Sequence, residues 1–429
     1  MPFNKLTTAV LLALASQTVQ ASGFALIEQS ASGQGSAYAG AAANAEDASV
    51  MWFNPAGLTE IKGSQAIIGA HIISPTAKFS DEGSTGPTGV LGGGGDDGAT
   101  IGFVPNIYWK GKVADYDIGL GINVPFGQHI SYDGNWAGRY NATETNLRTL
   151  NINPAIAHKM NDKVSFGFGL NAQYVDVVLE QKINQTAIGD PTVGNAKVTG
   201  DSWAFGYNLG FMFKPNDTLN VGLAYRSAMT HNVKGKVRYS DVNSTVPIAA
   251  GPTYLNQVLY NADASSKVDL PATASLGIDY NLSDRINLLA STTWTGWKAY
   301  DELVIEFDNG SPDSESNQNF KDSMRYALGL TYQLDEQLKL RTGIAFDESP
   351  VPNKYSRSPR TPDTDRTWLA FGFGYKMSKS MDLDIGYSHV FADKSDVNYT
   401  TTSSLGDNVL IGAYDTSVDI FSAQLVWKY

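Results

Sequence analysis

The feature that most constrains this chain is a long series of segments in which apolar residues alternate with polar or small ones, from about Ser64 to the C-terminus. In residues 164–174, Val, Phe, Phe, Leu, Ala and Tyr occupy every second position, with Ser, Gly, Gly, Asn and Gln between them. Successive side chains of a strand point to opposite faces, so each segment has one apolar face. Many segments reach about twelve residues, whereas globular strands average about five or six. The chain is therefore predicted to be all-β.

The connections between these segments alternate between short turns and long polar loops. Short turns fall at Gly111-Lys112, Asn161-Asp162, Pro215-Asn216-Asp217, Ser283-Asp284, Asp335-Glu336 and Ser378-Lys379. Long loops cover residues 80–99, 133–146, 184–195, 241–265, 308–319, 348–365 and 394–415. Short turns on one side and long loops on the other are typical of outer-membrane barrels. Counting strands between these breaks predicts a 14-stranded antiparallel transmembrane β-barrel over residues 64–429.

Both ends of the chain indicate export to the outer membrane of a Gram-negative bacterium. Lys5 precedes an apolar run at residues 9–15, and Val19-Gln20-Ala21 provides small residues before a cleavage point. This pattern predicts a secretory signal peptide at residues 1–21, since the run is too short for an uncleaved anchor. The last segment alternates up to a terminal Tyr429, which resembles the C-terminal strand signal of bacterial outer-membrane proteins.

Residues 22–63 do not alternate and are predicted to be a separate N-terminal hatch. They combine a run of small residues at 32–43 with the apolar group Met51-Trp52-Phe53 and a hard turn at Asn54-Pro55. The lumen of a fourteen-stranded barrel is too wide for the wall side chains to fill. A compact helical segment of this size is therefore expected to plug it.

Composition excludes several other classes of protein. The net charge of −12 and the lack of a basic stretch argue against a nucleic-acid partner. No apolar run of 18 residues follows the signal peptide, which argues against helical membrane spans. The absence of Cys excludes thiolate metal sites, and the five His residues are scattered without ligand spacing. We therefore expect no catalytic residue, no metal, no cofactor and no enzymatic activity.

Three blocks of sequence are specific in order and spacing. The first block is Ser22-Gly23-Phe24-Ala25-Leu26-x-Glu28, followed by Ser32-Gly33-x-Gly35-x-Ala37-Tyr38-x-Gly40, Asp47-Ala48 and Asn54-Pro55-Ala56. The second is Phe320-Lys321-Asp322-x-x-Arg325-x-Ala327-Leu328-Gly329 with the block 341–352, and the third is Val104-Pro105-Asn106. Together these blocks resemble the FadL family of outer-membrane channels for long-chain fatty acids and other hydrophobic compounds. The resemblance implies a fourteen-stranded barrel, an N-terminal hatch and passive lateral diffusion of substrate through the barrel wall.

The resemblance also implies which residues move and where the wall opens. Ser22, Gly23 and Phe24 become the mobile end of the hatch, and Asn54, Pro55 and Ala56 form its turn. The opening falls on Pro125, Phe126 and Gly127, in a strand that otherwise runs from Tyr116 to Ser131. Pro in a strand removes a ladder donor and indicates an edge or a bulge. On these residues alone, a simple bulge that relieves curvature is the alternative.

The chemical class of the substrate is left open by the sequence. The family's carboxylate-binding Arg and Lys positions align with Gln181 and Ser316, although Lys182 and Lys321 lie close by. A fatty acid with Lys182 as its head-group contact and an uncharged aromatic hydrocarbon are both consistent with this pattern. Residues 246–260 are unusually apolar for an exposed loop, and Tyr254, Leu255 and Leu259 are candidates for one wall of an entry groove. A loop helix that packs on its neighbours is the alternative.

The leading interpretation is thus a monomeric transporter of hydrophobic molecules that contacts outer-membrane lipid and lipopolysaccharide. The first alternative is a general diffusion porin in which residues 22–63 are only structural. An outer-membrane enzyme would need a Ser-His pair that these five His residues do not supply. An adhesive or structural barrel would need neither a plug nor a kinked strand.

Overall fold

The computed structural model describes residues 23–247 and 253–429. The predicted signal peptide and Ser22 lie outside the described residues. The helical elements are α2 (Ala31–Gln34), α3 (Val50–Phe53), η1 (Pro55–Glu60), η2 (Thr186–Ile188), η3 (Leu255–Gln257) and η4 (Trp297–Ala299). Within the described ranges, no helix is long and apolar enough to cross a membrane.

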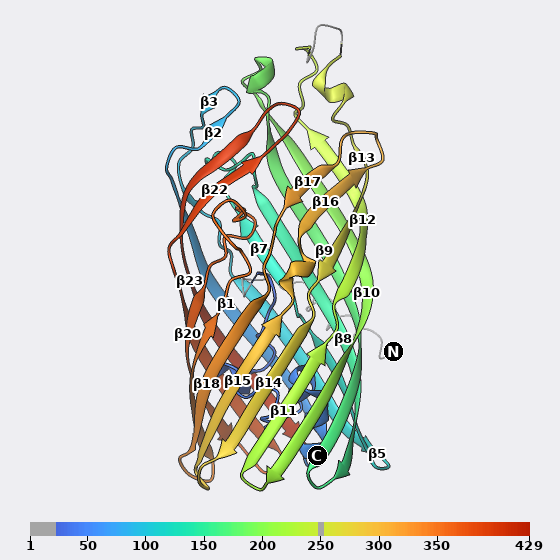
Figure 1. Ribbon diagram of the computed structural model, residues 1–429, viewed down its shortest axis with the longest axis vertical. Coiled ribbons are helices and arrows are strands. Elements are labelled where there is room, and N and C mark those ends of the chain that lie inside the picture. The colour runs from blue at the N-terminus through green and yellow to red at the C-terminus, as the bar shows by residue number, and fades with distance from the viewer. Residues whose placement is uncertain (1–22, 248–252) are drawn as a thin grey trace.

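The strands form one closed antiparallel barrel of 14 wall strands, as predicted (Figure 1). Eight elements cross as single strands: β1 (Gln65–Asp81), β5 (Gly102–Val113), β8 (Glu144–Asn161), β9 (Val164–Asn184), β10 (Val193–Asn216), β19 (Leu338–Asp347), β20 (Arg366–Lys376) and β23 (Asn408–Lys428). Each other wall strand consists of two strands in line: β6 (Tyr116–Asn123) with β7 (Gly127–Ser131), β11 (Leu219–Arg226) with β12 (Met229–Ser240), β14 (Thr273–Asn281) with β13 (Ala262–Leu270), β15 (Ile286–Thr295) with β16 (Glu302–Phe307), β18 (Ser323–Gln333) with β17 (Ser314–Asn317), and β21 (Met381–Ala392) with β22 (Ser395–Thr401). The barrel closes where β1 pairs with β23, from Gln65 opposite Lys428 to Asp81 opposite Gly412.

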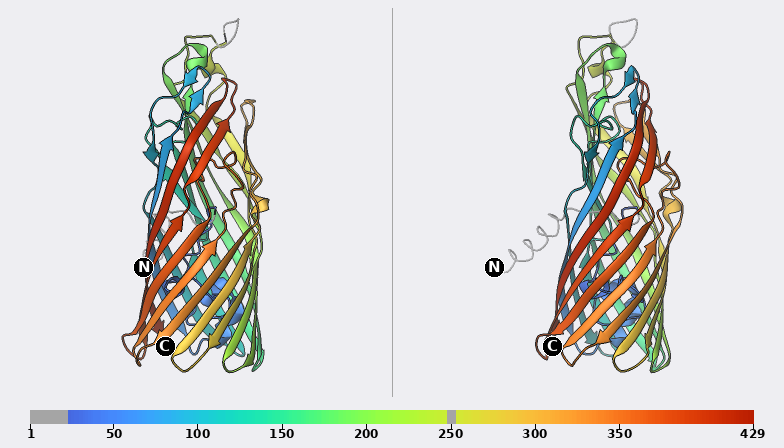
Figure 2. Two further views of the ribbon diagram at one scale, coloured as in Figure 1. Left: turned by 60° about the vertical axis from the view of Figure 1, so that its left-hand side comes forward. Right: turned by 90° about the vertical axis from the view of Figure 1, so that its left-hand side faces the viewer.

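The two ends of the barrel differ as the loop lengths predicted. Short turns lie at the end that also holds the C-terminus, and the long loops lie at the other end (Figures 1 and 2). The first long loop contains the short strands β2 (Thr85–Gly86), β3 (Gly89–Val90) and β4 (Asp96–Asp97). The predicted loop at 394–415 is instead mostly a hairpin of β22 and β23. Its strands were missed because β22 and the turn after it are mostly polar, which hides the alternation.

The outer surface of the barrel carries an apolar belt, because every second side chain of each wall strand points outward. Phe205 is 77% exposed and Leu170 is 54% exposed, although both lie in the middle of long strands. Near the end that holds the short turns, the Trp109 indole donates a hydrogen bond to the Tyr429 hydroxyl at 2.7 Å. Aromatic residues at such a level are typical of a membrane interface.

The segment before β1 lies inside the barrel, in the half that ends in the short turns (Figures 1 and 2). Its backbone approaches the wall so closely that only glycine fits at several wall positions. A Cβ atom at Gly222 would lie 1.8 Å from the Ala42 carbonyl oxygen, which is far inside van der Waals contact. Met51 is fully buried and packs in one cluster with Leu58 and Tyr108. The apolar group at residues 51–53 thus fills the lumen.

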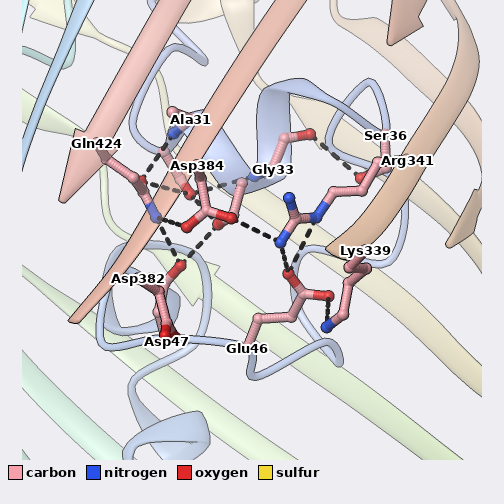
Figure 3. A network of polar contacts seen from close by, with 12 residues as sticks. Ala31, Gly33, Ser36, Glu46, Asp47, Lys339, Arg341, Asp382, Asp384 and Gln424 are labelled. Atoms are coloured by element: carbon pink, nitrogen blue, oxygen red, sulfur yellow. Dashed lines mark hydrogen bonds and ion pairs between the residues drawn. The ribbon is translucent and has the colours of Figure 1, made fainter. Parts of the chain in front are cut away.

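A buried polar network fastens this segment to the wall (Figure 3). Glu46 accepts ion pairs from Lys339 at 2.9 Å and from Arg341 at 2.7 Å. Arg341 also pairs with Asp384 of β21 at 2.8 Å. On the neighbouring strand β23, Gln424 donates to Asp47 at 2.8 Å and accepts from the Ala31 backbone N–H at 2.9 Å. Charges buried with such partners hold the body of the hatch in one position.

Candidate functional site

The third wall strand is broken between β6 and β7, at the predicted kink. β8 pairs with both parts, with Asn123 opposite Asn151 and Gly127 opposite Arg148. Residues 124–126 therefore face only residues 149–150 of β8, which is one residue more than regular pairing allows. The Phe126 N–H donates to the Thr149 hydroxyl at 3.0 Å, so the bulge is tied to β8.

The edge of the third wall strand that faces β5 is not paired with β5 around the kink. We call this gap in the hydrogen-bond pairing of the wall the window. Below the window the last pair is Ile107 opposite Ile122. Above it, pairing resumes with the isolated bridge between Ala99 and Ile130. Between these two points no wall strand in residues 23–247 and 253–429 pairs with the β5 side of the kink. An unpaired strand edge facing lipid costs several kcal/mol per backbone group, so this edge needs another partner.

The N-terminal end of the hatch supplies that partner. Ala25 forms an antiparallel bridge with Phe126, the Leu26 N–H donates to the Pro125 carbonyl at 2.8 Å, and the Gly127 N–H donates to the Phe24 carbonyl at 2.9 Å. The Gln29 side chain donates to the Val124 carbonyl at 2.8 Å. Residues 24–29 therefore act as a short extra strand on the lumen side of the window, and we call them the window segment.

Phe24 sits at the centre of an aromatic cluster in the lumen. Its ring lies 4.9 Å from Trp297, 5.2 Å from Tyr300 and 6.0 Å from Phe126, measured between centroids. The same cluster contains Leu270, Phe320 and Val351. Trp297, Leu270 and Phe320 lie at or next to breaks in wall strands opposite the kink. The cluster is an apolar site on the lumen side of the window, and its centre is a residue of the window segment.

One buried carboxylate holds the start of the window segment. The Gly23 N–H donates to Asp363 at 3.0 Å, and the Ser349 hydroxyl donates to the same oxygen at 2.8 Å. Gly23 has a φ of +64°, and a Cβ atom there would lie 2.7 Å from the Trp297 ring. Sequence reasoning did not identify Asp363 or Trp297. Both residues are far from Gly23 in the sequence, and only the fold brings them into contact with it.

The predicted turn of the hatch, Asn54-Pro55-Ala56, contacts a part of the wall that is separate from the window. Asn54 is fully buried and donates to the Ala42 carbonyl at 2.7 Å and to the Phe211 carbonyl of β10 at 3.0 Å. Its side-chain oxygen accepts from the Ala56 N–H at 3.0 Å, which caps η1, and Pro55 begins that helix. Asn54, Pro55 and Ala56 therefore lie with β9 and β10, not at the window.

Glu28 lies within the window segment, and its burial leads us to expect that docking of this segment depends on pH. It is 2% exposed, and one of its carboxylate oxygens has no hydrogen-bond partner among the described residues. Burial raises its pKa from 4.5 to about 7, against the lowering effect of a backbone hydrogen bond and of the Arg366 and Arg325 charges. A released Glu28 in water would keep a pKa near 4.5. Between these two pKa values the docked segment binds a proton that the released segment has lost.

We therefore expect docking of the window segment to be strongest at acid pH and to weaken as the pH rises from about 5 to 7. One pKa unit corresponds to about 1.4 kcal/mol. Hydrogen exchange of the Gly127 amide, which the segment protects, should accelerate over this range beyond the intrinsic base catalysis. In Glu28→Gln the excess acceleration should disappear, and an unchanged pH profile in this variant would contradict the assignment to Glu28.

The predicted ligand residue Lys182 does not face the lumen. Gln181, its neighbour in β9, points into the barrel and accepts a hydrogen bond from Arg360 at 3.0 Å. Lys182 therefore points outward, because successive side chains of a strand alternate, and it bonds the Asn195 side chain on β10. The structure thus corrects the placement of Lys182 in the pocket. The cation that reaches this level of the lumen is Arg360, from the loop at 348–365.

The predicted entry-groove residues lie at the tip of the extracellular loops. Tyr254 precedes η3 and forms a capping box with Gln257. Leu255 is buried, and Leu259 is half-buried. The Asn256 N–H donates to the Asn243 carbonyl at 3.1 Å, within the same loop. These contacts fit a loop helix packed on its neighbours, and the entry groove stays a prediction.

A barrel that holds its N-terminal segment in the lumen and pairs it with a break in the wall is consistent with a transport protein. The family model described as outer membrane protein transport protein (OMPP1/FadL/TodX) matches residues 12–429. This chain belongs to that family of outer-membrane transporters.

Known proteins are similar to this chain, in sequence or in fold, over nearly its whole length. A long-chain fatty acid transport protein of Escherichia coli K12 is 30% identical and is covered to 94%, with 92% of this chain aligned. The fold is similar to that of a crystallised Pseudomonas aeruginosa FadL homologue, with a TM-score of 0.85, 24% identity and coverage of 95% of this chain and 99% of that one. It is also similar to the toluene transporter TodX of Pseudomonas putida, with a TM-score of 0.69, 16% identity and coverage of 89% and 94%.

Proposed function

We propose that this protein takes up long-chain fatty acids or similarly hydrophobic molecules and releases them sideways into the outer membrane through the window between β5 and β7. Residues 22–63 serve as the hatch and residues 64–429 as the barrel. Gly23 and Phe24 are the mobile end that opens the path. The observation that carries the proposal is the bridge of Ala25 with Phe126, because the window edge is paired with a hatch segment and not with a neighbouring wall strand.

The physical reason for a side exit is the partitioning of the substrate. Each buried CH₂ group contributes about 0.8 kcal/mol, so a long acyl chain favours an apolar site strongly over water. The polar lipopolysaccharide surface slows its direct entry into the membrane. The aromatic cluster around Phe24 offers an apolar site below that surface, and the window leads from this site to lipid. The molecule then reaches the membrane without a second passage through water.

The difference between the body of the hatch and its end supports gating by a small movement. The body is fixed by buried ion pairs such as Arg341 with Glu46 at 2.7 Å. The window segment has no ion pair among the described residues. It is held by backbone hydrogen bonds, by neutral side-chain hydrogen bonds such as that from Gln29 to the Val124 carbonyl, and by the contacts of the Phe24 ring. A ligand that takes the place of the Phe24 ring competes directly with docking of the segment. Ligand binding therefore opens the window while the lumen stays plugged to ions.

Closing the window by a change in the wall tests this proposal. Deletion of Val124 together with Pro125→Thr removes the extra residue and restores a ladder donor, so the third strand can pair with β5 throughout. We expect uptake of a labelled long-chain fatty acid and of a labelled aromatic hydrocarbon to fall by roughly tenfold or more. A matched control is Pro154→Thr in β8, outside the kink. Unaltered uptake in a correctly folded deletion variant would overturn the side exit.

A further inference from the structure

Three cationic side chains stand in a row on the outer face of β12. Lys234, Lys236 and Arg238 occupy every second position of this strand, so their side chains share one face. All three are exposed, whereas the alternate residues Val233 and Val237 are buried toward the lumen. β12 pairs with β10 on one side and with β13 on the other, in the upper half of the barrel (Figure 1). We call these three cationic residues the basic row.

The basic row lies just above the apolar belt, on the side of the long loops. Below it in the same wall strand, the outward residues Leu223 and Tyr225 of β11 are exposed and belong to the belt. On β10 the apolar outward residues end at Trp203, and the next outward residue is Asp201, which is opposite Lys234. An exposed Trp at such a place marks the membrane interface. The basic row therefore lies at the level of the head groups of the outer leaflet.

Two further cations next to the basic row are already paired with carboxylates. Lys197 of β10 pairs with Glu180 at 2.5 Å, and Lys267 of β13 pairs with Asp269 at 2.9 Å. Both pairs neutralise their own charge within the wall, and they leave the basic row without those carboxylates.

The basic row itself has little acidic compensation. Lys236 reaches Asp263 only at 4.0 Å, and these two side chains are 63% and 68% exposed. An ion pair that is so exposed contributes little. Lys234 and Arg238 make no ion pair with any residue in the ranges 23–247 and 253–429. Three neighbouring cations repel one another, so their arrangement in one row fits an anionic partner outside the chain.

The length of the basic row favours one kind of anionic lipid. Positions 234 and 238 are four residues apart, which is about 13 Å along a strand. A phospholipid carries its phosphate at one level of the membrane, while lipopolysaccharide carries phosphates and acidic sugars at several levels above its acyl chains. Ammonium and guanidinium groups form strong charge-assisted hydrogen bonds to such oxyanions. An anion that extends outward from the membrane matches the direction in which β12 runs.

We propose that the basic row is a binding surface for lipopolysaccharide of the outer leaflet, with phosphates of this lipid over Lys234, Lys236 and Arg238. The family assignment places the chain in the outer membrane, where this lipid lies against the upper part of the wall. The inference concerns the outer wall alone and is independent of the proposed release of substrate through the window.

Binding of lipids that differ in their anionic groups tests this surface. The folded full-length mature protein in a neutral detergent should be titrated with lipid A that bears two acidic sugars, with the same lipid after removal of its phosphates, and with phosphatidylglycerol. A chelator keeps divalent cations from bridging phosphates to the nearby carboxylates, and native mass spectrometry counts the bound lipids. We expect phosphorylated lipid A to bind more tightly than either of the other two lipids, by roughly tenfold or more.

A triple variant, Lys234→Gln with Lys236→Gln and Arg238→Gln, removes the charges of the basic row. Each basic residue near an anionic membrane surface contributes enough for an affinity change of about fivefold. We therefore expect the variant to bind phosphorylated lipid A roughly 10- to 100-fold more weakly, with binding of the dephosphorylated lipid unchanged. The heat stability of the folded barrel on a gel controls for folding.

The matched control changes the charge by the same amount at the other end of the barrel. It combines Lys112→Gln, Lys159→Gln and Lys163→Gln, which are exposed positions at or next to the short turns. This control variant should bind all three lipids as the wild type does, because these lysines lie far from the outer leaflet.

Four results would contradict the proposal. Unchanged binding in the variant of the basic row would place lipopolysaccharide elsewhere on the barrel. Equal weakening in the control variant would reduce the effect to net charge. Equal affinity of the wild type for lipid A with and without phosphates, or for lipid A and phosphatidylglycerol, would remove the recognition of lipopolysaccharide phosphates without any variant. None of these results bears on the release of substrate through the window, which uptake measures separately.

Discussion

Oxidation of a cysteine pair at Ala25→Cys and Phe126→Cys is expected to stop uptake of a long-chain fatty acid, and reduction is expected to restore it. These two residues are bridge partners at the window. Directly opposite residues of an antiparallel pair have Cβ atoms about 4.5–5.5 Å apart, close to the range of a disulfide. The chain contains no Cys, so only the engineered bond forms. A locked window segment cannot leave the wall, and we expect uptake to fall by roughly tenfold or more.

A second cysteine pair provides the control for this experiment. Ala70→Cys and Ala423→Cys are opposite each other in the permanent ladder between β1 and β23. Their oxidation should leave uptake unchanged, because these strands do not separate in the proposed cycle. Uptake should be measured with a labelled fatty acid in cells, before and after a reductant that reaches the outer membrane. Full uptake by the oxidised window pair would mean that substrate leaves by another path.

Replacement of Arg341 by Met is expected to convert the plugged barrel into an ion-conducting one. The Arg341 side chain is 5% exposed and joins Glu46 of the hatch to Asp384 of β21 (Figure 3). Its loss leaves two carboxylates facing each other without their shared cation. Removal of one partner of a buried ion pair typically costs about 3–5 kcal/mol. That cost falls on the docked hatch, so single-channel recordings in planar bilayers should show frequent open events.

Lys339→Met is the matched control for this prediction. Lys339 contacts the same Glu46 carboxylate at 2.9 Å, but its side chain is 33% exposed. Partly exposed pairs contribute about 0–1 kcal/mol, so this variant should stay closed for most of the recording. Equal conductance of the two variants, or a closed Arg341→Met channel, would show that other contacts hold the hatch. In that case the close fit of Ala42 against Gly222 is the next candidate.

The barrel could be predicted because it follows from patterns between neighbouring residues in the sequence. Alternation of side chains and the contrast of short turns with long loops need no knowledge of tertiary contacts. The kinked strand was predicted from Tyr116 to Ser131, and the structure has β6 and β7 over the same residues. Breaks in other wall strands were missed, including the break between β13 and β14 at Pro271-Ala272. The break between β11 and β12 at Ser227-Ala228 is one such case.

The residues around the predicted ligand site show the limit of sequence reasoning. Lys182 was chosen because it is adjacent to the expected position in the sequence. A shift of one residue along a strand turns the side chain to the opposite face, so proximity in sequence is misleading there. Arg360 carried no signal of its own, because its contacts with Gln181 and Thr145 span about 180 and 215 residues. Only folding of the loop at 348–365 into the lumen brings them together.

The sequence by itself determined that this protein is an exported barrel with an apolar outer belt and a small-residue plug, because these properties follow from the period of the side chains and from local composition. The tertiary structure alone decided what closes the window and which cation lies in the lumen at the level of Gln181. Both depend on contacts between distant segments, namely Ala25 with Phe126, Gly23 with Asp363, and Arg360 with β8 and β9. Such pairings minimise unpaired backbone and buried charge over the whole molecule, and no local pattern records them.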